Sequence, residues 1–100
     1  MKILISGDRN WKDLGLIKEI LEGFKSDTTT NVVLCYIDFV IFIPVANDLG
    51  LAVEKCDDSL TGIDYLLIFH KYIRGSVRSK LLIKDASRKN IPYQIVGSSF

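Results

Sequence analysis

The fold is decided by residues 2–11, which read KILISGDRNW. The apolar run Ile3–Ile5 is followed at once by Ser6, Gly7 and Asp8. A short apolar run that ends in polar residues and glycine is typical of a strand buried in a parallel sheet and followed by a loop. This stretch therefore predicts a strand over about 2–6 with a loop at its carboxyl end.

An amphipathic helix is predicted after this loop, over about 13–25. Its apolar residues recur at spacings of three and four, as expected for one face of a helix, and they are Leu14, Ile17, Ile20, Leu21 and Phe24. A polar break follows, and the β-branched, apolar residues 32–35 then predict a second short strand.

The segment 37–50 is ambiguous. Phe39–Ile43 has the composition of a strand, whereas Val45–Gly50 ends like a helix with a glycine stop, and Pro44 would break or kink a helix interior. We favour a distorted helix over about 39–49, because the flanking runs 32–35 and 51–55 both resemble strands that need a crossover between them.

The second half of the chain repeats the alternation of strand and helix. A polar loop at 56–62 leads to the clearest buried strand, 64–69, and Ser76 caps a helix that precedes a last strand at 90–96. This order predicts one α/β domain over 1–100, a small Rossmann-like three-layer sandwich with a five-stranded, mainly parallel sheet in the order 3-2-1-4-5.

Composition excludes several classes of function. Thirteen Lys and Arg against 12 Asp and Glu leave a net charge of +1, which gives no strong nucleic-acid signal and little attraction for anionic membranes. The longest apolar stretch, 32–46, is broken by Asp38 and is too short to span a bilayer, and the first residues do not resemble a signal peptide, so we expect a cytoplasmic protein. Cys35 and Cys56 lack metal-ligand or redox spacing and are expected to be reduced, inert core thiols, so neither a metal nor a cofactor is predicted.

Two loops are expected to meet where the winding of the sheet reverses, the usual place for ligands in such folds. In the first, Gly7 permits close backbone approach, Arg9 offers a planar fork for phosphate or carboxylate, and Trp11 would stack on a base. The alternative is a tight turn in which Arg9 pairs with Asp8 or Asp13 and Trp11 packs on the first helix.

The second loop, 70–76, leads into the last helix. Free backbone N–H groups at Gly75 and Ser76 would point at an anion there, and Arg74 adds positive charge. An ordinary helix start with Ser76 as the cap would explain the same residues.

The remaining polar candidates favour structural roles. His70 is the single histidine and has no partner spaced for a metal site or a catalytic triad. Asp57 and Asp58 are expected to be solvated, although they are suited to holding a cation or acting as a base. Asp38 either caps the next helix or lies at the same rim as Arg9. No catalytic residue is assigned.

The apolar cluster in the middle of the chain is larger than one helix face needs. Its members are Tyr36, Phe39, Phe42 and Ile43. They predict either an interface between copies of the chain in a homo-oligomer or extra core.

Residues 2–11 resemble the amino-terminal signature of a small branch of the SLOG superfamily, in which a strand runs into glycine, a small or polar residue, arginine, a polar residue and tryptophan. Residues 64–70, 74–76 and 90–92 are similar to that branch as well, and the matched segments cover a little under half of the chain. The resemblance implies a Rossmann-like domain that binds a nucleotide-derived ligand.

The departures from this family concern its central glycine motif, which should fall near 34–40, where this chain has no glycine. The glycine-rich motif and glutamate of the related Lonely Guy phosphoribohydrolases are also absent, which argues against an enzyme. A reduced relative of this kind also fits a viral or mobile-element source. We therefore expect a sensor or sequestering protein that binds a nucleotide-like small molecule through Gly7, Asp8, Arg9, Trp11, Arg74, Gly75 and Ser76. The alternative is an inactive interaction protein that oligomerises or blocks a partner through residues 36–45.

Overall fold

The computed structural model describes residues 1–27, 32–56, 60–71 and 77–97. Strands and helices alternate along most of the chain. The elements are β1 (Lys2–Gly7), α1 (Leu14–Asp27), β2 (Val33–Tyr36), α2 (Ile43–Asp48), β3 (Ala52–Lys55), β4 (Tyr65–Phe69), α3 (Val77–Arg88) and β5 (Tyr93–Val96). Each predicted strand is present, with bounds that differ by at most a few residues.

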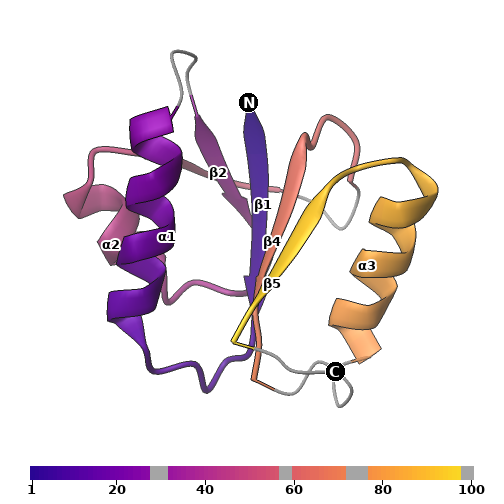
Figure 1. Ribbon diagram of the computed structural model, residues 1–100, viewed down its shortest axis with the longest axis horizontal. Coiled ribbons are helices and arrows are strands. Elements are labelled where there is room, and N and C mark those ends of the chain that lie inside the picture. Colours follow the sequence, from indigo (N-terminus) through magenta and orange to yellow (C-terminus); the bar gives the residue numbers. More distant parts are fainter. Residues whose placement is uncertain (28–31, 57–59, 72–76, 98–100) are drawn as a thin grey trace.

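The strands form one five-stranded sheet in the order β3-β2-β1-β4-β5, and all neighbours are parallel. The predicted Rossmann-like α/β fold and its strand order are thus confirmed. β1 is the central strand, with Leu4 beside Cys35 of β2 and Gly7 beside Phe69 of β4. Figure 1 shows β1 between β2 and β4, with the carboxyl ends of the strands at one edge of the molecule.

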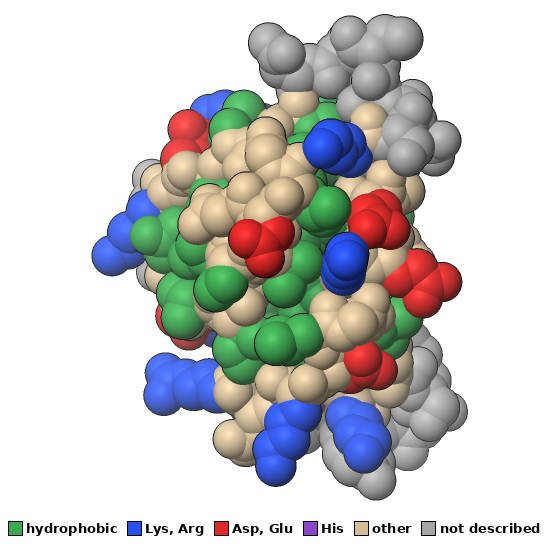
Figure 2. Space-filling model, turned by 90° about the vertical axis from the view of Figure 1, so that its left-hand side faces the viewer, with side chains coloured by type: hydrophobic (Ala, Val, Ile, Leu, Met, Phe, Trp, Pro, Cys, Tyr) green, Lys and Arg blue, Asp and Glu red, His purple; other side chains and the backbone are tan. Residues whose placement is uncertain are grey.

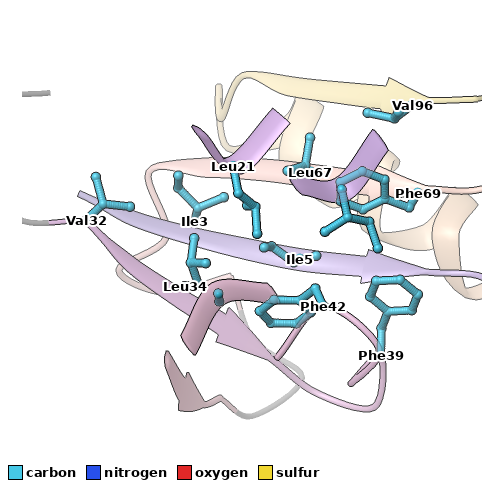
Figure 3. Close-up of a cluster of buried hydrophobic side chains, with 12 residues drawn as sticks. Ile3, Ile5, Leu21, Val32, Leu34, Phe39, Phe42, Leu67, Phe69 and Val96 are labelled. Atoms are coloured by element: carbon cyan, nitrogen blue, oxygen red, sulfur yellow. The ribbon is translucent and has the colours of Figure 1, made fainter. Parts of the chain in front are cut away.

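Helices cover both faces of the sheet (Figure 1). α1 and α2 lie on one face and α3 on the other. Apolar side chains alternate between the two faces along each strand, so that Ile3 and Ile5 point to the α1 side while Leu4 points to the α3 side. Figure 3 shows the larger cluster, which fills the space between the sheet and the α1–α2 layer.

The helix predicted over 39–49 is shorter than expected, because it begins only at Ile43. Pro44 lies in its first turn, where its missing N–H is not needed, so it starts the helix instead of kinking it. The predicted glycine stop is confirmed, since Gly50 follows the end of α2 with φ +74°.

Phe39 and Phe42, ahead of this helix, belong to the core. Their side chains are 2% and 0% exposed. The Phe39 ring stacks on Phe42 and on Phe69, with centroids 6.1 and 6.2 Å apart. The structure therefore gives these two phenylalanines the extra-core role, and they are not available to an interface, because they are not on the surface.

The outer face of the α1–α2 layer is mixed in character. Figure 2 shows apolar side chains across this face, with acidic and basic side chains among them. Leu14 and Val40 are about half exposed, at 47% and 50%, whereas Tyr36 and Ile43 are only partly exposed. Within the described ranges, no helix has the length and apolar character needed to cross a membrane.

Candidate functional site

A pocket of about 400 Å³ lies where β1 and β4 end and α3 begins. We call it the switch-point pocket, because the chain winds in opposite directions from these two strands. Its walls come from the loop after β1, the residue after β4, the segment after β2 and the first turn of α3, and the lining residues are Ser6, Gly7, Asp8, Arg9, Asn10, Asp38, His70, Arg78 and Ser79. The predicted first loop thus lines a pocket at the predicted edge of the sheet.

Asp8 holds the first loop in shape through its backbone and its side chain. Its N–H donates to the carbonyl of Phe69 at 2.9 Å, and its own carbonyl accepts from the N–H of Trp11 at 3.0 Å. Its carboxylate Oδ1 accepts the N–H of Asn10 at 3.0 Å, which is an Asx turn. Asp8 therefore fixes the course of the loop that carries Arg9.

Arg9 is exposed at this pocket. Within the described ranges it forms no ion pair, neither with Asp8 nor with Asp13, the two partners that the sequence suggested. Asp8 accepts from Asn10, and Asp13 Oδ1 accepts the N–H of Leu16 at 3.0 Å near the start of α1. The guanidinium is thus available to a ligand.

Asp38 lies at the same pocket as Arg9, which was one of the two positions that the sequence left open. It accepts a hydrogen bond from Arg78 Nη1 at 2.9 Å, and both side chains are partly exposed. This pair joins the segment after β2 to the first turn of α3 and closes one side of the pocket. The four charged residues of the lining, Arg9, Arg78, Asp8 and Asp38, balance one another in formal charge.

Gly7 is required by the packing of the chain on itself. A Cβ atom at this position would lie 2.5 Å from the carbonyl oxygen of Phe69 and 2.9 Å from the ring of Phe39. The close backbone approach that a glycine permits is therefore used by β4 and by Phe39. Because the Phe39 ring fills the open side of Gly7, the glycine is a weaker indication of a bound phosphate than the sequence implied.

Trp11 does not line the pocket. Its indole Nε1–H donates to the carbonyl of Asp13 at 2.9 Å, and its ring lies 5.6 Å from the ring of Phe69, between centroids. A Cβ at Gly97 would meet the same ring, with the indole Cζ3 2.8 Å away. The indole thus packs on the end of the sheet, whereas the sequence suggested either stacking on a base or packing on the first helix.

No protein-family model, curated protein or solved structure matches this chain. The function is therefore inferred from the pocket itself.

The second predicted loop is described only in part. Arg74, Gly75 and Ser76 lie outside the described residues, as do Asp57 and Asp58. His70 lines the pocket, and its backbone N–H donates to the carbonyl of Val96 at 3.1 Å, which holds the end of β4 beside β5.

Two further pocket residues, Arg78 and Ser79, were not singled out from the sequence. Both lie in the first turn of α3, and Ser79 is buried at 2% exposure. The available signal was their position just after the predicted helix cap, since the first turn of a helix at this edge of a parallel sheet faces the ligand position.

Proposed function

We propose that the protein binds a small, phosphate-bearing, nucleotide-like molecule in the switch-point pocket and acts as a sensor or sequestering protein. The position of the pocket supports this function, because ligands of open α/β sheets bind beside the carboxyl ends of the strands where the winding reverses. Its volume of about 400 Å³ falls within the usual range for small-molecule sites.

The observation that carries the proposal is that Arg9 is exposed at the pocket and not engaged in an ion pair with the described residues. The second arginine of the lining, Arg78, is by contrast paired with Asp38. A planar guanidinium matches phosphate oxygens in a bidentate manner. Arg9 is therefore the expected phosphate ligand.

The acidic residues of the lining favour a ligand that also carries hydroxyl groups. Asp8 and Asp38 offset the two arginines in charge, so a simple anion gains little from the net charge of the pocket. Carboxylates accept hydrogen bonds from hydroxyls, as acidic residues do from the ribose of dinucleotides in related folds. A ribose phosphate with an attached base supplies both kinds of group.

Membership of the SLOG superfamily is part of this proposal, and the resemblance of residues 2–11 supports it. The departure near 34–40 has a physical consequence, since Phe39 fills the space beside Gly7 that a glycine in its place would leave open. We therefore expect the phosphate to be held by the side chain of Arg9 and the loop after Gly7, and not at Gly7 itself.

Replacing Arg9 by alanine tests the proposal. Isothermal titration of the wild-type protein with AMP, ADP, NAD and ribose 5-phosphate identifies the best probe, and adenosine beside AMP isolates the contribution of the phosphate. We expect Arg9→Ala to weaken binding of that probe about 10- to 100-fold, because a hydrogen bond to a charged group contributes roughly 1.5–3 kcal/mol. A probe at 100 times its Kd should also stabilise the wild-type protein by roughly 2.7 kcal/mol.

Arg88→Ala is the matched control. It removes the same charge from the far end of α3, where Arg88 pairs with Asp85 outside the switch-point pocket. We expect it to leave affinity unchanged. Equal losses of affinity in both variants would mean that Arg9 acts only through its general positive charge. Wild-type affinity in Arg9→Ala would refute the site.

A further inference from the structure

Three side chains with metal-ligand chemistry lie together on the α3 face of the sheet, away from the switch-point pocket. Cys35 is on β2, Glu54 on β3 and Cys56 directly after β3. One ligand atom from each, the two sulfurs and a carboxylate oxygen, lies within 4.8 Å of the other two. We call this group the thiol–carboxylate cluster.

The parallel register brings the cluster together. Cys35 of β2 is the register partner of Glu54 of β3, so the two side chains project from the same face of the sheet. The N–H of Cys56 donates to the carbonyl of Tyr36 at 2.8 Å, which continues the β2–β3 ladder by one residue. Because side chains two residues apart on an extended chain share a face, Cys56 returns to the side of Glu54 and Cys35.

The distance between two of the ligand atoms fits a tetrahedral metal ion. Cys35 Sγ lies 3.7 Å from Glu54 Oε1. With metal–sulfur and metal–oxygen distances of about 2.3 and 2.1 Å, the two ligands of a tetrahedral zinc ion are about 3.6 Å apart. This pair therefore needs almost no movement to share a metal.

We propose that Cys35, Glu54 and Cys56 form a binding site for Zn²⁺ or a similar thiophilic divalent metal. Thiolates select zinc over magnesium and calcium, and a carboxylate is an accepted third ligand. Cys35 is fully buried, Cys56 is partly exposed and Glu54 is exposed. The site therefore lies between the buried and the exposed side of the sheet, and the described residues supply three of the four ligands of a tetrahedral ion.

Lys2 completes the charge balance. Its Nζ lies 2.9 Å from Glu54 Oε1, and this contact lowers the pKa of Glu54, which keeps the carboxylate ionised. Two thiolates and one carboxylate exceed the charge of a divalent ion by one, and the ammonium of Lys2 offsets that excess. The Lys2 side chain is 48% exposed, so it can move from Oε1 to admit the metal.

Burial raises the pKa of the Cys35 thiol to about 12, with a hydrogen bond to Cys56 as the second cause. Cys35 is therefore protonated in the metal-free protein at neutral pH, and the metal takes the place of its proton. Protons are released on binding, as at other thiolate sites. The site was not predicted from the sequence, because Cys35 lies on β2 and Cys56 follows β3, and no local motif contains both.

Titration of the reduced full chain with Co²⁺ tests the proposal, because cobalt reports its ligands optically. We expect one equivalent to produce thiolate-to-cobalt charge-transfer absorption and the visible bands of tetrahedral cobalt, and Zn²⁺ to remove both. Cys56→Ser should lower the charge-transfer intensity by at least about half and weaken cobalt binding, because it removes one of the two thiolates. Glu54→Gln should weaken metal binding by at least about 10-fold, the lower end of the loss seen even for outer-shell partners.

Two further measurements keep the result independent of folding defects. Arg9→Ala, which alters the other site, should bind Co²⁺ as the wild type does, and Zn²⁺ should protect Cys56 of the wild type from iodoacetamide. The proposal is overturned if the reduced protein gives no charge-transfer band, or if Cys56→Ser keeps the full wild-type intensity and affinity. It is equally overturned if the two cysteines form a disulfide in air while the reduced protein binds no metal.

Discussion

Phe39→Ala is expected to lower the free energy of unfolding by about 3–5 kcal/mol, the usual range for loss of a buried phenylalanine ring. Phe39 is 2% exposed and stacks on Phe42 and Phe69. It also fills the space beside Gly7, so its loss would leave a cavity next to the central strand (Figure 3). Denaturant unfolding followed by circular dichroism measures the change.

Val40→Ala is the control for this prediction. The neighbouring residue is 50% exposed, and we expect its truncation to change stability by no more than about 0.5 kcal/mol. The two variants also separate core from interface. If Phe39→Ala kept wild-type stability but changed the oligomeric state in light scattering, the residue would belong to an interface and its place in the core would be wrong.

Gly7→Ala is expected to destabilise the protein by about 1–3 kcal/mol, as overpacking of a filled core does. The added methyl would lie 2.5 Å from the carbonyl oxygen of Phe69, which is backbone and cannot turn aside. β1 and β4 would therefore have to separate at the pocket end. In thermal unfolding, each kcal/mol lowers the Tm of a domain of this size by roughly 4–8 °C.

The matched control is Gly23→Ala, the same substitution in α1. Apart from its chain neighbours and the backbone of α1, no atom lies within 4 Å of the position that its Cβ would take, so the change should stabilise the helix by about 0.5–1 kcal/mol. The double variant Gly7→Ala, Phe39→Ala separates the two contacts of the added methyl. Removing the Phe39 ring relieves the contact with that ring but leaves the contact with the Phe69 carbonyl oxygen. A Gly7→Ala protein of normal stability that fails to bind AMP would instead make Gly7 a ligand-binding residue.

The fold was predictable because its signals are local. Apolar runs such as Ile3–Ile5 and Leu66–Phe69 identify buried strands, and the handedness of crossovers then leaves few possible strand orders. The start of α2 was missed because Pro44 was interpreted as a break inside a helix, whereas proline in the first turn marks a helix start. Residues 39–42 have a composition that suits strand or helix, and the place of Phe39 beside Gly7 depends on the folded chain.

The candidate site was predictable to the same extent. Topology indicated the loop after β1, including Arg9, but not the contact between Asp38 and Arg78, which are 40 residues apart in sequence. That contact depends on where α3 begins relative to β2. The thiol–carboxylate cluster was missed for a related reason. The register between β2 and β3 brings its members together, and this register cannot be deduced from the spacing of the residues along the sequence.

The central place of β1 has a consequence for the order in which the chain folds. β1 is synthesised before the other strands of the sheet, yet it hydrogen-bonds on one side to β2 and on the other to β4, whose residues follow about sixty positions later. Until β4 has been synthesised, the edge of β1 that pairs with β4 has no partner strand. Pairing between strands far apart in sequence loses the entropy of loop closure before the contacts between the strands stabilise the chain. It therefore forms more slowly than local pairing. The nascent chain therefore has to keep the open edge of residues 2–7 from pairing with other chains until the residues of β4 have been added.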